Sequence, residues 1–545
     1  MEVYLMKQIY IDLMDKVFSA YTDKEIIDYF KRTKETSISE HGFPRIVANL
    51  GVLIAHGKRE YFKDLFKEMM DFVTADFLVN VGKNGWRTGN EFSVREIVTC
   101  LMEVEKSGVF PESVIKKWRE NLKKFNPKEN YGIFLEDSPN KTNNWVVFAA
   151  SSEQAREYAG LLDESEYIDN LIKTQVSLFD ENGMYRDPNE PIVYDLVTRY
   201  LFMILIHFGY EGKYKGFIED ILEKSADLTL CMQSVTGEIP FGGRSAQFIH
   251  NETNFAAILE FYAGFFKRKG DLKKAGMFKR AARLAIENAK KRLTGEKIYH
   301  VKNFYPNDSK FGCEQYAYFD KYMITAASWM YLAYFMADDT IKEVPCPAED
   351  GNFIEKTSDL FHLAFIKHGD WYLELDLNAN THYDSSGLGR VHKRGVPSEL
   401  CLSLPFSKEP NYGIDIENPS EFSISIVPGG KYRILDKEVT DEKAFLKAEC
   451  EKDGKTYIEE ITVFDDFVEI VSPAGDEIMF PVFSFDGETK TEIKQTENEV
   501  SVSYKGHKVT FTSNGKITDL KKEYANRNGH YMAFSAEGNL RISME

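Results

Sequence analysis

A short polar stretch between two helical patterns contains residue types that could bind an acidic sugar and take a proton from it. In chain order it holds Pro240, the Gly242–Gly243 pair, Arg244, His250, Asn251 and Glu252. The proline and the glycine pair predict a tight turn. A guanidinium can hold a carboxylate and an imidazole can act as a general base. The alternative is a helix-to-helix loop whose polar residues cap the ends of helices.

A second candidate group is formed by Asn143, Asn144 and Trp145, which open a predicted helix over 144–162. Amide donors and a helix N-terminus both favour a bound anion. The indole could stack on a sugar ring. Ordinary capping of the helix by Thr142 or Asn143 explains the same residues equally well.

A third group contains three tyrosines, Tyr316, Tyr318 and Tyr322, at the start of a helix predicted over 316–336. Tyr318 and Tyr322 are spaced i,i+4 and would share one helix face. A tyrosine can transfer a proton if neighbouring cations lower its pKa. The alternative is a stripe of aromatic core residues.

The fourth group lies far along the chain, in a polar segment from 378 to 395 that follows a predicted strand. It carries His382, Tyr383, Arg390, His392 and Lys393. A hairpin between strands does not need so long a polar loop, so a binding loop is indicated. We expect this loop to reach over to the Arg244–His250 turn and to complete one site from both halves of the chain.

The elements that must position these groups change character once along the chain. Up to about residue 340 the apolar residues recur with a helical period, over 9–20, 45–55, 61–79, 93–104, 144–162, 194–208, 217–232, 254–267, 272–291 and 316–336. Several of these segments are apolar nearly all round, as expected for inner helices covered by outer ones. About six such helical hairpins predict a closed α/α toroid.

After Pro345 the period becomes two, which is typical of strands. The alternation is clear over 371–377, 422–426 and 500–504, and Gly-containing turn signals recur between such segments. Many short strands at regular spacing predict an antiparallel β-sandwich. The predicted fold is therefore a multidomain α+β protein, with a helical toroid over 1–345 as the catalytic domain and a β-sandwich over 346–545.

Composition restricts the partners. The chain has 545 residues and a net charge of −18, which argues against nucleic acid and anionic membranes as partners. The six cysteines are scattered without metal-binding spacing, so we expect reduced thiols, no metal site and no cofactor. The N-terminus lacks the pattern of a signal peptide and no apolar run is long enough to span a bilayer. These features favour a cytoplasmic protein.

The arrangement of these groups resembles the heparinase-like and alginate-lyase-like polysaccharide lyases, which join an α/α toroid to a β-sandwich. The segments 242–245, 249–252, 382–384 and 389–393 are most similar to the lyases that remove L-rhamnose from α-1,4-linked D-glucuronate. The resemblance implies β-elimination: the proton on C5 of a uronic acid is removed and a 4,5-unsaturated product forms. The implied partner is an acidic oligosaccharide.

The same resemblance implies roles for individual residues. Asn144 and Arg244 would neutralise the uronate carboxylate, and His250 with Tyr316 or Tyr318 would supply base and acid. His382 would close the site from the β half. The expected substrate-binding residues are Asn143, Asn144, Trp145, Asn251, Glu252, Tyr383, Arg390, His392 and Lys393. Heparinases carry an Asn-His pair early in the toroid, whereas Trp145 follows Asn144 here, so the identity of the base stays open.

Two other functions fit the same residues. A toroid glycoside hydrolase could use Asp195 and Glu252 as its carboxylate pair. A non-catalytic glycan-binding protein would hold uronate oligosaccharides without changing them. Only the lyase produces an unsaturated uronate that absorbs ultraviolet light.

Overall fold

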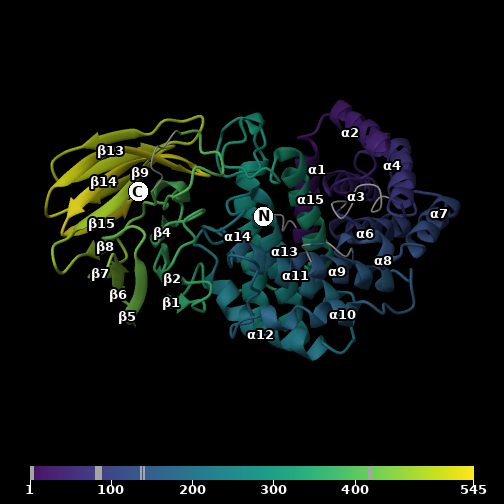
Figure 1. The fold of residues 1–545 in the computed structure, drawn as a ribbon, viewed down its shortest axis with the longest axis horizontal. Helices are drawn as coiled ribbons and strands as arrows, with labels where there is room; N and C mark the ends of the chain where they lie inside the picture. The colour runs from purple at the N-terminus through teal and green to yellow at the C-terminus, as the bar shows by residue number, and fades with distance from the viewer. Residues whose placement is uncertain (1–4, 80–88, 135–137, 139–140, 415–419) are drawn as a thin grey trace.

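The computed structural model describes residues 5–79, 89–134, 138, 141–414 and 420–545. The N-terminal part of the chain is helical and the C-terminal part consists of antiparallel sheets (Figure 1). This confirms the predicted order of an α/α toroid followed by a β-sandwich. No helix within the described residues is both long enough and apolar enough to cross a membrane.

The helical part contains long helices joined by short connections. Their bounds are α1 Met6–Phe18, α2 Asp23–Thr36, α3 Gly42–Ala55, α4 Lys63–Asp76, α6 Asn90–Ser107, α7 Glu112–Lys123, α8 Pro127–Asn130, α9 Asn144–Tyr158, α10 Ile168–Lys173, α11 Ile192–His207, α12 Lys215–Cys231, α13 Ile249–Arg268, α14 Leu272–Leu293 and α15 Phe319–Met336. Helices α3, α13 and α15 are buried on nearly every face, whereas α7 and α14 have one apolar stripe and one polar face.

The inner helices form a closed ring. Helix α3 contacts α6, and the contacts continue through α9, α11, α13 and α15 until α15 packs against α3 again. The outer layer is formed by α1, α4, α7, α10, α12 and α14, each of which packs on an inner helix or on its outer neighbour. The apolar residues on all sides of the inner helices explain this arrangement, because only a second layer removes them from water.

Buried ion pairs lie both between and within the inner helices. Arg45 on α3 donates to Glu96 on α6 at 2.9 Å. On α11, Arg199 and Asp195 pair at 2.8 Å with both side chains fully buried. Substitution of one partner of such a pair lowers the stability of the fold strongly, because the other charge stays buried without its partner.

The C-terminal part contains three antiparallel sheets. Their strands are β1 Phe353–Lys356, β2 Leu363–His368, β3 Trp371–Asp376, β4 Gly387–Lys393, β5 Lys431–Val439, β6 Ala444–Lys452, β7 Lys455–Val463, β8 Val468–Val471, β9 Glu477–Phe485, β10 Glu492–Gln495, β11 Glu499–Tyr504, β12 His507–Thr512, β13 Ile517–Asn526, β14 Gly529–Glu537 and β15 Asn539–Met544. The sheet orders are β1-β2-β3-β4, β10-β11-β12-β15-β8-β7-β6-β5 and β13-β14-β9.

The three sheets share one apolar core, because alternate residues of their strands point to the same side. Along β6 the fully buried residues are Ala444, Leu446, Ala448 and Cys450. They belong to the same cluster as Leu373 of the four-stranded sheet and other residues of all three sheets. The predicted strand over 422–426 is wrong: these residues make only isolated bridges, from Phe422, Ile424 and Ser425.

The four-stranded sheet lies between the helices and the other two sheets (Figure 1). Phe365 and Tyr372 on this sheet pack into the helical core, and the Tyr372 hydroxyl donates to the Cys231 carbonyl at 3.0 Å. In the opposite direction, Phe241 from the helical part packs into the core of the sheets. The two parts therefore exchange side chains across their junction.

Three element boundaries differ from the sequence predictions, and each affects a candidate residue. Helix α13 begins at Ile249, so His250 lies in its first turn and not in the preceding loop. Helix α15 begins at Phe319, so Tyr316 precedes it and Tyr318 is its N-cap. The polar segment from 378 to 395 is a shorter loop, because Gly387–Lys393 pairs with β3 as strand β4.

Candidate functional site

A cavity of about 470 Å³ lies at one end of the helical ring, within the size range of small-ligand sites. Its polar lining residues are Glu40, His41, Arg45, Asn143, Asn144, Asp187, Tyr194, Arg244, Ser245, His250, Asn251, Tyr316, Lys321, Tyr322 and Thr325, and its rings include Phe92, Trp145, Phe148 and Trp329. Seven residues predicted from the sequence are among them: Asn143, Asn144, Trp145, Arg244, His250, Asn251 and Tyr316.

The cavity collects the N-terminal ends of all six inner helices. His41 and Gly89 are the N-cap residues of α3 and α6, and Asn143 is that of α9. Helices α11, α13 and α15 contribute residues of their first turns: Val193 and Tyr194, His250 and Asn251, and Lys321 and Tyr322. The first turn of a helix carries a partial positive charge, because its N–H groups have no partners within the helix itself. The cavity is therefore suited to an anion.

Arg244 is carried into the cavity by a strained turn. Gly242 and Gly243 have φ of +94° and +86°, and Ser245 adopts φ +59°, a region that L-residues seldom occupy. The Arg244 guanidinium stacks on the Tyr194 ring at 4.0 Å and pairs with Asp187. Its Nε is buried and, among the described residues, has no hydrogen-bond partner. Part of this cation is thus available to a ligand.

Asp187, which sequence reasoning did not identify, supports this arginine from a loop before α11. Burial raises the pKa of its carboxyl, although Arg244 and the backbone N–H of Asn144 act in the opposite direction. One carboxyl oxygen, Oδ1, is buried without a partner in the described part of the chain. The amide of Asn144 lies beside it on the cavity wall.

His250 has the properties of a general base. Its side chain is 6% exposed, and Nδ1 is buried and has no hydrogen-bond partner among the described residues. Burial, together with the nearby charge of Arg45, holds the pKa of His250 well below its ordinary value. The ring is therefore neutral at pH 7 and able to accept a proton.

Tyr316 is joined to two other hydroxyls. It contacts the Ser245 hydroxyl at 2.8 Å, and Ser245 contacts the Tyr194 hydroxyl at 3.3 Å. Burial raises the pKa of Tyr316 and also that of Tyr322, which faces His250. Raised values contradict the expectation that cations lower a tyrosine pKa here. Protonated phenols suit the general acid better than the base.

His41, which belongs to none of the four groups identified from the sequence, also lines the cavity. Its ring lies 6.4 Å from Tyr322 and 5.4 Å from Phe92. Burial and the charges of Arg45 and Lys321 hold the pKa of His41 well below its ordinary value. The sequence feature that could have identified His41 is its position directly before the inner helix α3.

Two of the carboxylates and one of the tyrosines predicted for chemistry do not line the cavity. Asp195 is held by Arg199. Glu252 is fully buried, pairs with Lys302 and accepts from the Ile239 N–H at 3.1 Å. Tyr318 lies under the Lys310 ammonium at 4.3 Å. The i,i+4 spacing of Asp195 and Arg199 on α11 was visible in the sequence, but periodicity could not show the partners of Glu252 and Tyr318, because Lys302 and Lys310 come from other segments.

The candidate residues of the β part also lie outside the cavity. Arg390 is buried between Glu374 at 2.8 Å and Glu238 at 3.3 Å. His392 contacts the Ser234 hydroxyl at 2.6 Å and the Val396 carbonyl at 2.9 Å, and burial lowers its pKa to about 4.

The remaining three differ in exposure. Lys393 donates to the Met544 carbonyl at 3.0 Å. His382 is exposed and packs on Tyr383. Tyr383 shares a small crevice with Arg244 beside the cavity. Of the predicted loop, this tyrosine and its neighbour Asp384 approach the Arg244 turn.

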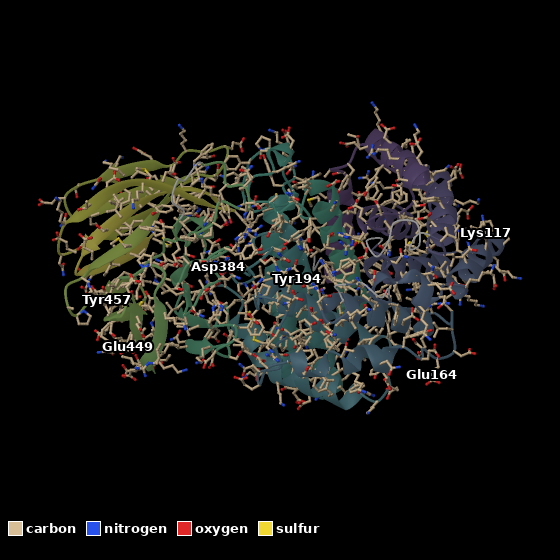
Figure 2. All side chains as sticks on the ribbon, viewed as in Figure 1. Lys117, Glu164, Tyr194, Asp384, Glu449 and Tyr457 are labelled. Carbon is tan, nitrogen blue, oxygen red and sulfur yellow. The ribbon has the colours of Figure 1, made fainter. Side chains whose placement is uncertain are left out.

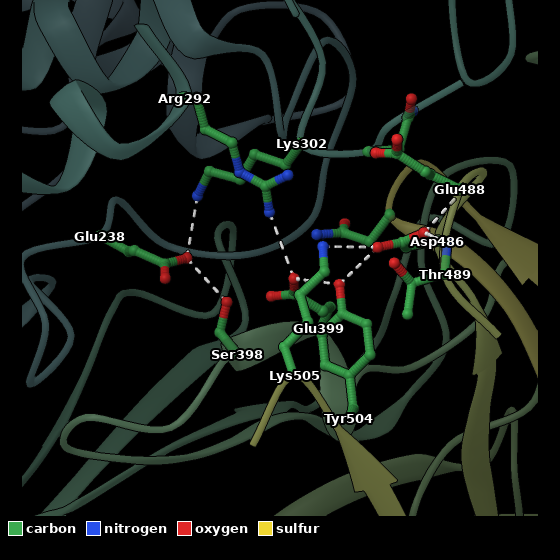
Figure 3. A network of polar contacts seen from close by, with 12 residues as sticks. Glu238, Arg292, Lys302, Ser398, Glu399, Asp486, Glu488, Thr489, Tyr504 and Lys505 are labelled. Atoms are coloured by element: carbon green, nitrogen blue, oxygen red, sulfur yellow. Dashed lines mark hydrogen bonds and ion pairs between the residues drawn. The ribbon is translucent and has the colours of Figure 1, made fainter. Parts of the chain in front are cut away.

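A polar network along the domain junction accounts for several of these buried charges. Lys302 donates to Glu238 at 2.9 Å, and Glu238 also accepts from the Ser398 hydroxyl. Figure 3 shows this pair beside a second group in which Glu399 and Asp486 accept from Tyr504. Because these charged side chains pair with one another across the junction, the network joins the two domains.

The described residues contain no group of three or more His, Cys, Asp or Glu side chains that could hold a metal ion. Comparison with known proteins finds no matching family model and no matching curated protein. Among solved structures, the chain is similar to heparan sulfate lyase HepC from Pedobacter heparinus, with 11% identity, TM-score 0.34 and coverage of 88% of this chain and 75% of that one.

Two further solved structures show the same level of similarity. Heparinase III has 9% identity and TM-score 0.34, covering 82% of this chain and 76% of that one. A β-L-arabinofuranosidase of glycoside hydrolase family 127 from Geobacillus stearothermophilus T6 has 12% identity and TM-score 0.36, covering 100% of this chain and 99% of that one.

Proposed function

We propose that this protein is a lyase that cleaves uronate-containing oligosaccharides by β-elimination. The observation that carries the proposal is the convergence of six inner-helix N-termini on one cavity that also holds a neutral His250 and a partly unpaired Arg244. An electropositive site with a neutral base suits an anionic substrate that must lose a proton.

The substrate carboxylate would bind to Arg244, whose Nε has no hydrogen-bond partner among the described residues, and to the Asn144 amide, both of which line the cavity. Charge-assisted hydrogen bonds to a guanidinium are among the strongest available to a carboxylate. The rings of Trp145 and Trp329 line the same cavity and offer flat apolar surfaces to a pyranose. Together they would orient C5 of the uronate for attack.

The proposed reaction divides its proton transfers between His250 and Tyr316. Neutralising the carboxylate stabilises the enolate-like intermediate, so the proton on C5 becomes more acidic. His250 takes this proton, and the electron pair forms the C4–C5 double bond as the C4–O bond breaks. Tyr316 donates its phenolic proton to the departing oxygen, with the Ser245 and Tyr194 hydroxyls aligned behind it. His41, whose ring centroid lies 6.4 Å from that of Tyr322, is the alternative base.

The decisive experiment is an ultraviolet assay on a panel of uronate oligosaccharides, with mass spectrometry of the products. A lyase gives two products, one of which absorbs ultraviolet light, and their masses add up to the mass of the substrate because no water is added. The sequence resemblance to rhamnose–glucuronate lyases makes a rhamnose-capped glucuronate the first substrate to test. Unchanged oligosaccharide across the panel would support the glycan-binding alternative.

A hydrolase is the second candidate, because the cavity contains two carboxylates, Asp187 and Glu40. The raised pKa of Asp187 and its unpartnered Oδ1 are features of a general acid. This pair replaces Asp195 and Glu252, which do not line the cavity. Products that gain the mass of one water and do not absorb would establish the hydrolase and reject the lyase.

We also propose that the helical domain over 1–345 is the catalytic one and the domain over 346–545 its support, and that the enzyme acts in the cytoplasm. All six cysteines are free thiols, which supports a reducing compartment. Fractionation of cells that produce the protein would test the location.

A further inference from the structure

We propose that Asp384 and Arg527, both in the sheet domain, are positioning residues that fix the turn carrying Arg244 and Ser245 to the cavity. The inference rests on the proposed function, because Arg244 is the group assigned to the substrate carboxylate. It adds a regulatory consequence: the sheet domain controls whether the cavity is formed correctly.

Asp384 holds the turn through its backbone. Both carboxyl oxygens accept from the Gly243 N–H, Oδ1 at 2.9 Å and Oδ2 at 2.7 Å. The carboxyl is buried at the junction of the two domains, and Figure 2 shows Asp384 in the sheet part next to the helical part that carries Tyr194. A carboxylate that accepts a backbone N–H forms one of the stronger hydrogen bonds in proteins.

Glycine at position 242 is required by this contact. A Cβ on Gly242 would lie 2.5 Å from Asp384 Oδ1, and the residue's φ of +94° already disfavours a side chain. The turn can therefore approach the carboxyl only with glycine at this position. The close approach indicates that the backbone conformation around Arg244 depends on Asp384.

Arg527 holds the other side of the same turn. Its guanidinium donates to both oxygens of Glu314, at 2.7 Å and 2.5 Å, and to the Gly312 carbonyl at 2.8 Å. Glu314 in turn accepts from the Ser245 N–H at 3.1 Å. Because Ser245 contacts the Tyr316 hydroxyl, the pair also aligns the proposed acid.

The Asp384 contact is sensitive to pH. Burial and the neighbouring Asp376 raise the pKa of Asp384 to about 7, against the effects of Gly243, His362 and Arg527. Besides these groups, Glu190 lines the adjoining crevice with Arg244 and Tyr383. Protonation removes the negative charge and one acceptor oxygen, so the contact to Gly243 weakens as the pH falls through about 7.

Hydrogen–deuterium exchange of the full-length protein tests the contact without using activity. In the peptide covering 239–248 we expect faster exchange in Asp384→Ala, Gly242→Ala and Arg527→Lys than in the wild type. The matched controls are Asp466→Ala, an exposed aspartate of the sheet domain, and Arg541→Lys, whose ion pair with Glu469 is exposed. Unchanged exchange in Asp384→Ala and Arg527→Lys would overturn the proposal.

Kinetics separate positioning from general stability. Asp384→Asn keeps one acceptor oxygen and should lower kcat/KM by about tenfold at pH 8, mainly through KM, with Asp384→Ala lower still. Burial raises the pKa of Asp384 from 3.8 in the unfolded chain to about 7 in the folded protein. The protonated carboxyl therefore favours folding below pH 3.8, and this contribution is lost as the pH rises through about 7. Above that pH the ionised buried carboxylate opposes folding. At pH 8 the Tm of Asp384→Asn should therefore not fall. A lower Tm with unchanged kcat/KM would show a merely structural role.

The two tests also distinguish failure of this proposal from failure of the proposed function. If the wild type cleaves no oligosaccharide of the panel, faster exchange in the Asp384 and Arg527 variants still supports their hold on the turn. If the wild type is active and the variants exchange faster but keep full kcat/KM, the positioning role is wrong while the lyase assignment stands.

Discussion

The ring centroids of His250 and Tyr322 lie 4.5 Å apart, with the two planes inclined at 46°. They belong to the first turns of α13 and α15, and His41 from the start of α3 contacts Tyr322 from another side. The rings of His250, Tyr322 and His41 thus come from three separate inner helices and meet at the cavity. Because the pKa of His250 is lowered and its Nδ1 has no hydrogen-bond partner among the described residues, it is available for proton transfer.

The first prediction concerns this histidine. His250→Ala should lower kcat by about 10²- to 10⁴-fold, the usual range for loss of a general base, and should leave Tm nearly unchanged because no hydrogen bond is lost. The matched control is His207→Ala on α11, a largely buried histidine that packs on Phe335 outside the cavity. Equal activity of the two variants would assign the base to His41.

The second prediction separates two neighbouring tyrosines. Tyr316→Phe should lose about 10²-fold or more in kcat, since its hydroxyl faces the cavity and joins Ser245. Tyr318→Phe should keep nearly full activity, because Tyr318 lies outside the cavity under Lys310. The initial rate of ultraviolet absorbance increase measures both. A greater loss in Tyr318→Phe would contradict the assigned acid.

The third prediction concerns the carboxylate-binding group. Arg244→Lys keeps the charge but removes the Nε donor and the planar stack on Tyr194. We expect KM to rise by about tenfold or more, with a smaller effect on kcat. Arg433→Lys, on an exposed strand, is the control. An unchanged KM would mean that another residue binds the carboxylate.

The fourth prediction is a pH profile. The wild-type kcat/KM should fall as the pH decreases through about 7, where Asp384 becomes protonated. His250 does not cause this limb, because its pKa is held well below 6.5 and it stays neutral there. In Asp384→Asn the limb near pH 7 should disappear and only a fall at lower pH should remain. Persistence of the limb in that variant would assign it to a different group.

The fifth prediction tests a structural role for Glu252. Lys302 pairs with both Glu252 and Glu238 in the buried junction. Lys302→Met would leave Glu252 without its cation and Glu238 with Arg390 alone, at a cost of about 3–5 kcal/mol in the free energy of unfolding. Urea denaturation measures the loss, with Lys494→Met on an exposed strand as the control. A much smaller loss would mean that one carboxylate is normally protonated.

The sequence by itself determined the two kinds of architecture and part of the site. Residues apolar on all sides of long helices require a second layer, and alternation after Pro345 requires sheets, so toroid and sandwich followed from periodicity. Asn144 could be identified because it opens a predicted helix, and Arg244 and His250 because they follow closely on the turn predicted from Pro240 and the Gly242–Gly243 pair. Polar and charged residues at the start of a helix usually either cap its N–H groups or bind an anionic ligand.

The tertiary structure alone decided which residues share the cavity. Closure of the ring brings His41 to Tyr322 across 281 positions of sequence, and no local pattern encodes that contact. The same closure places Asp187 beside Arg244 and Lys302 beside Glu252, and the docking of the sheets gives Arg390 and His392 buried partners in the helical part. A polar residue in a sequence looks the same whether it meets a ligand or a buried counter-charge. Only the partner that folding supplies determines which of the two it becomes.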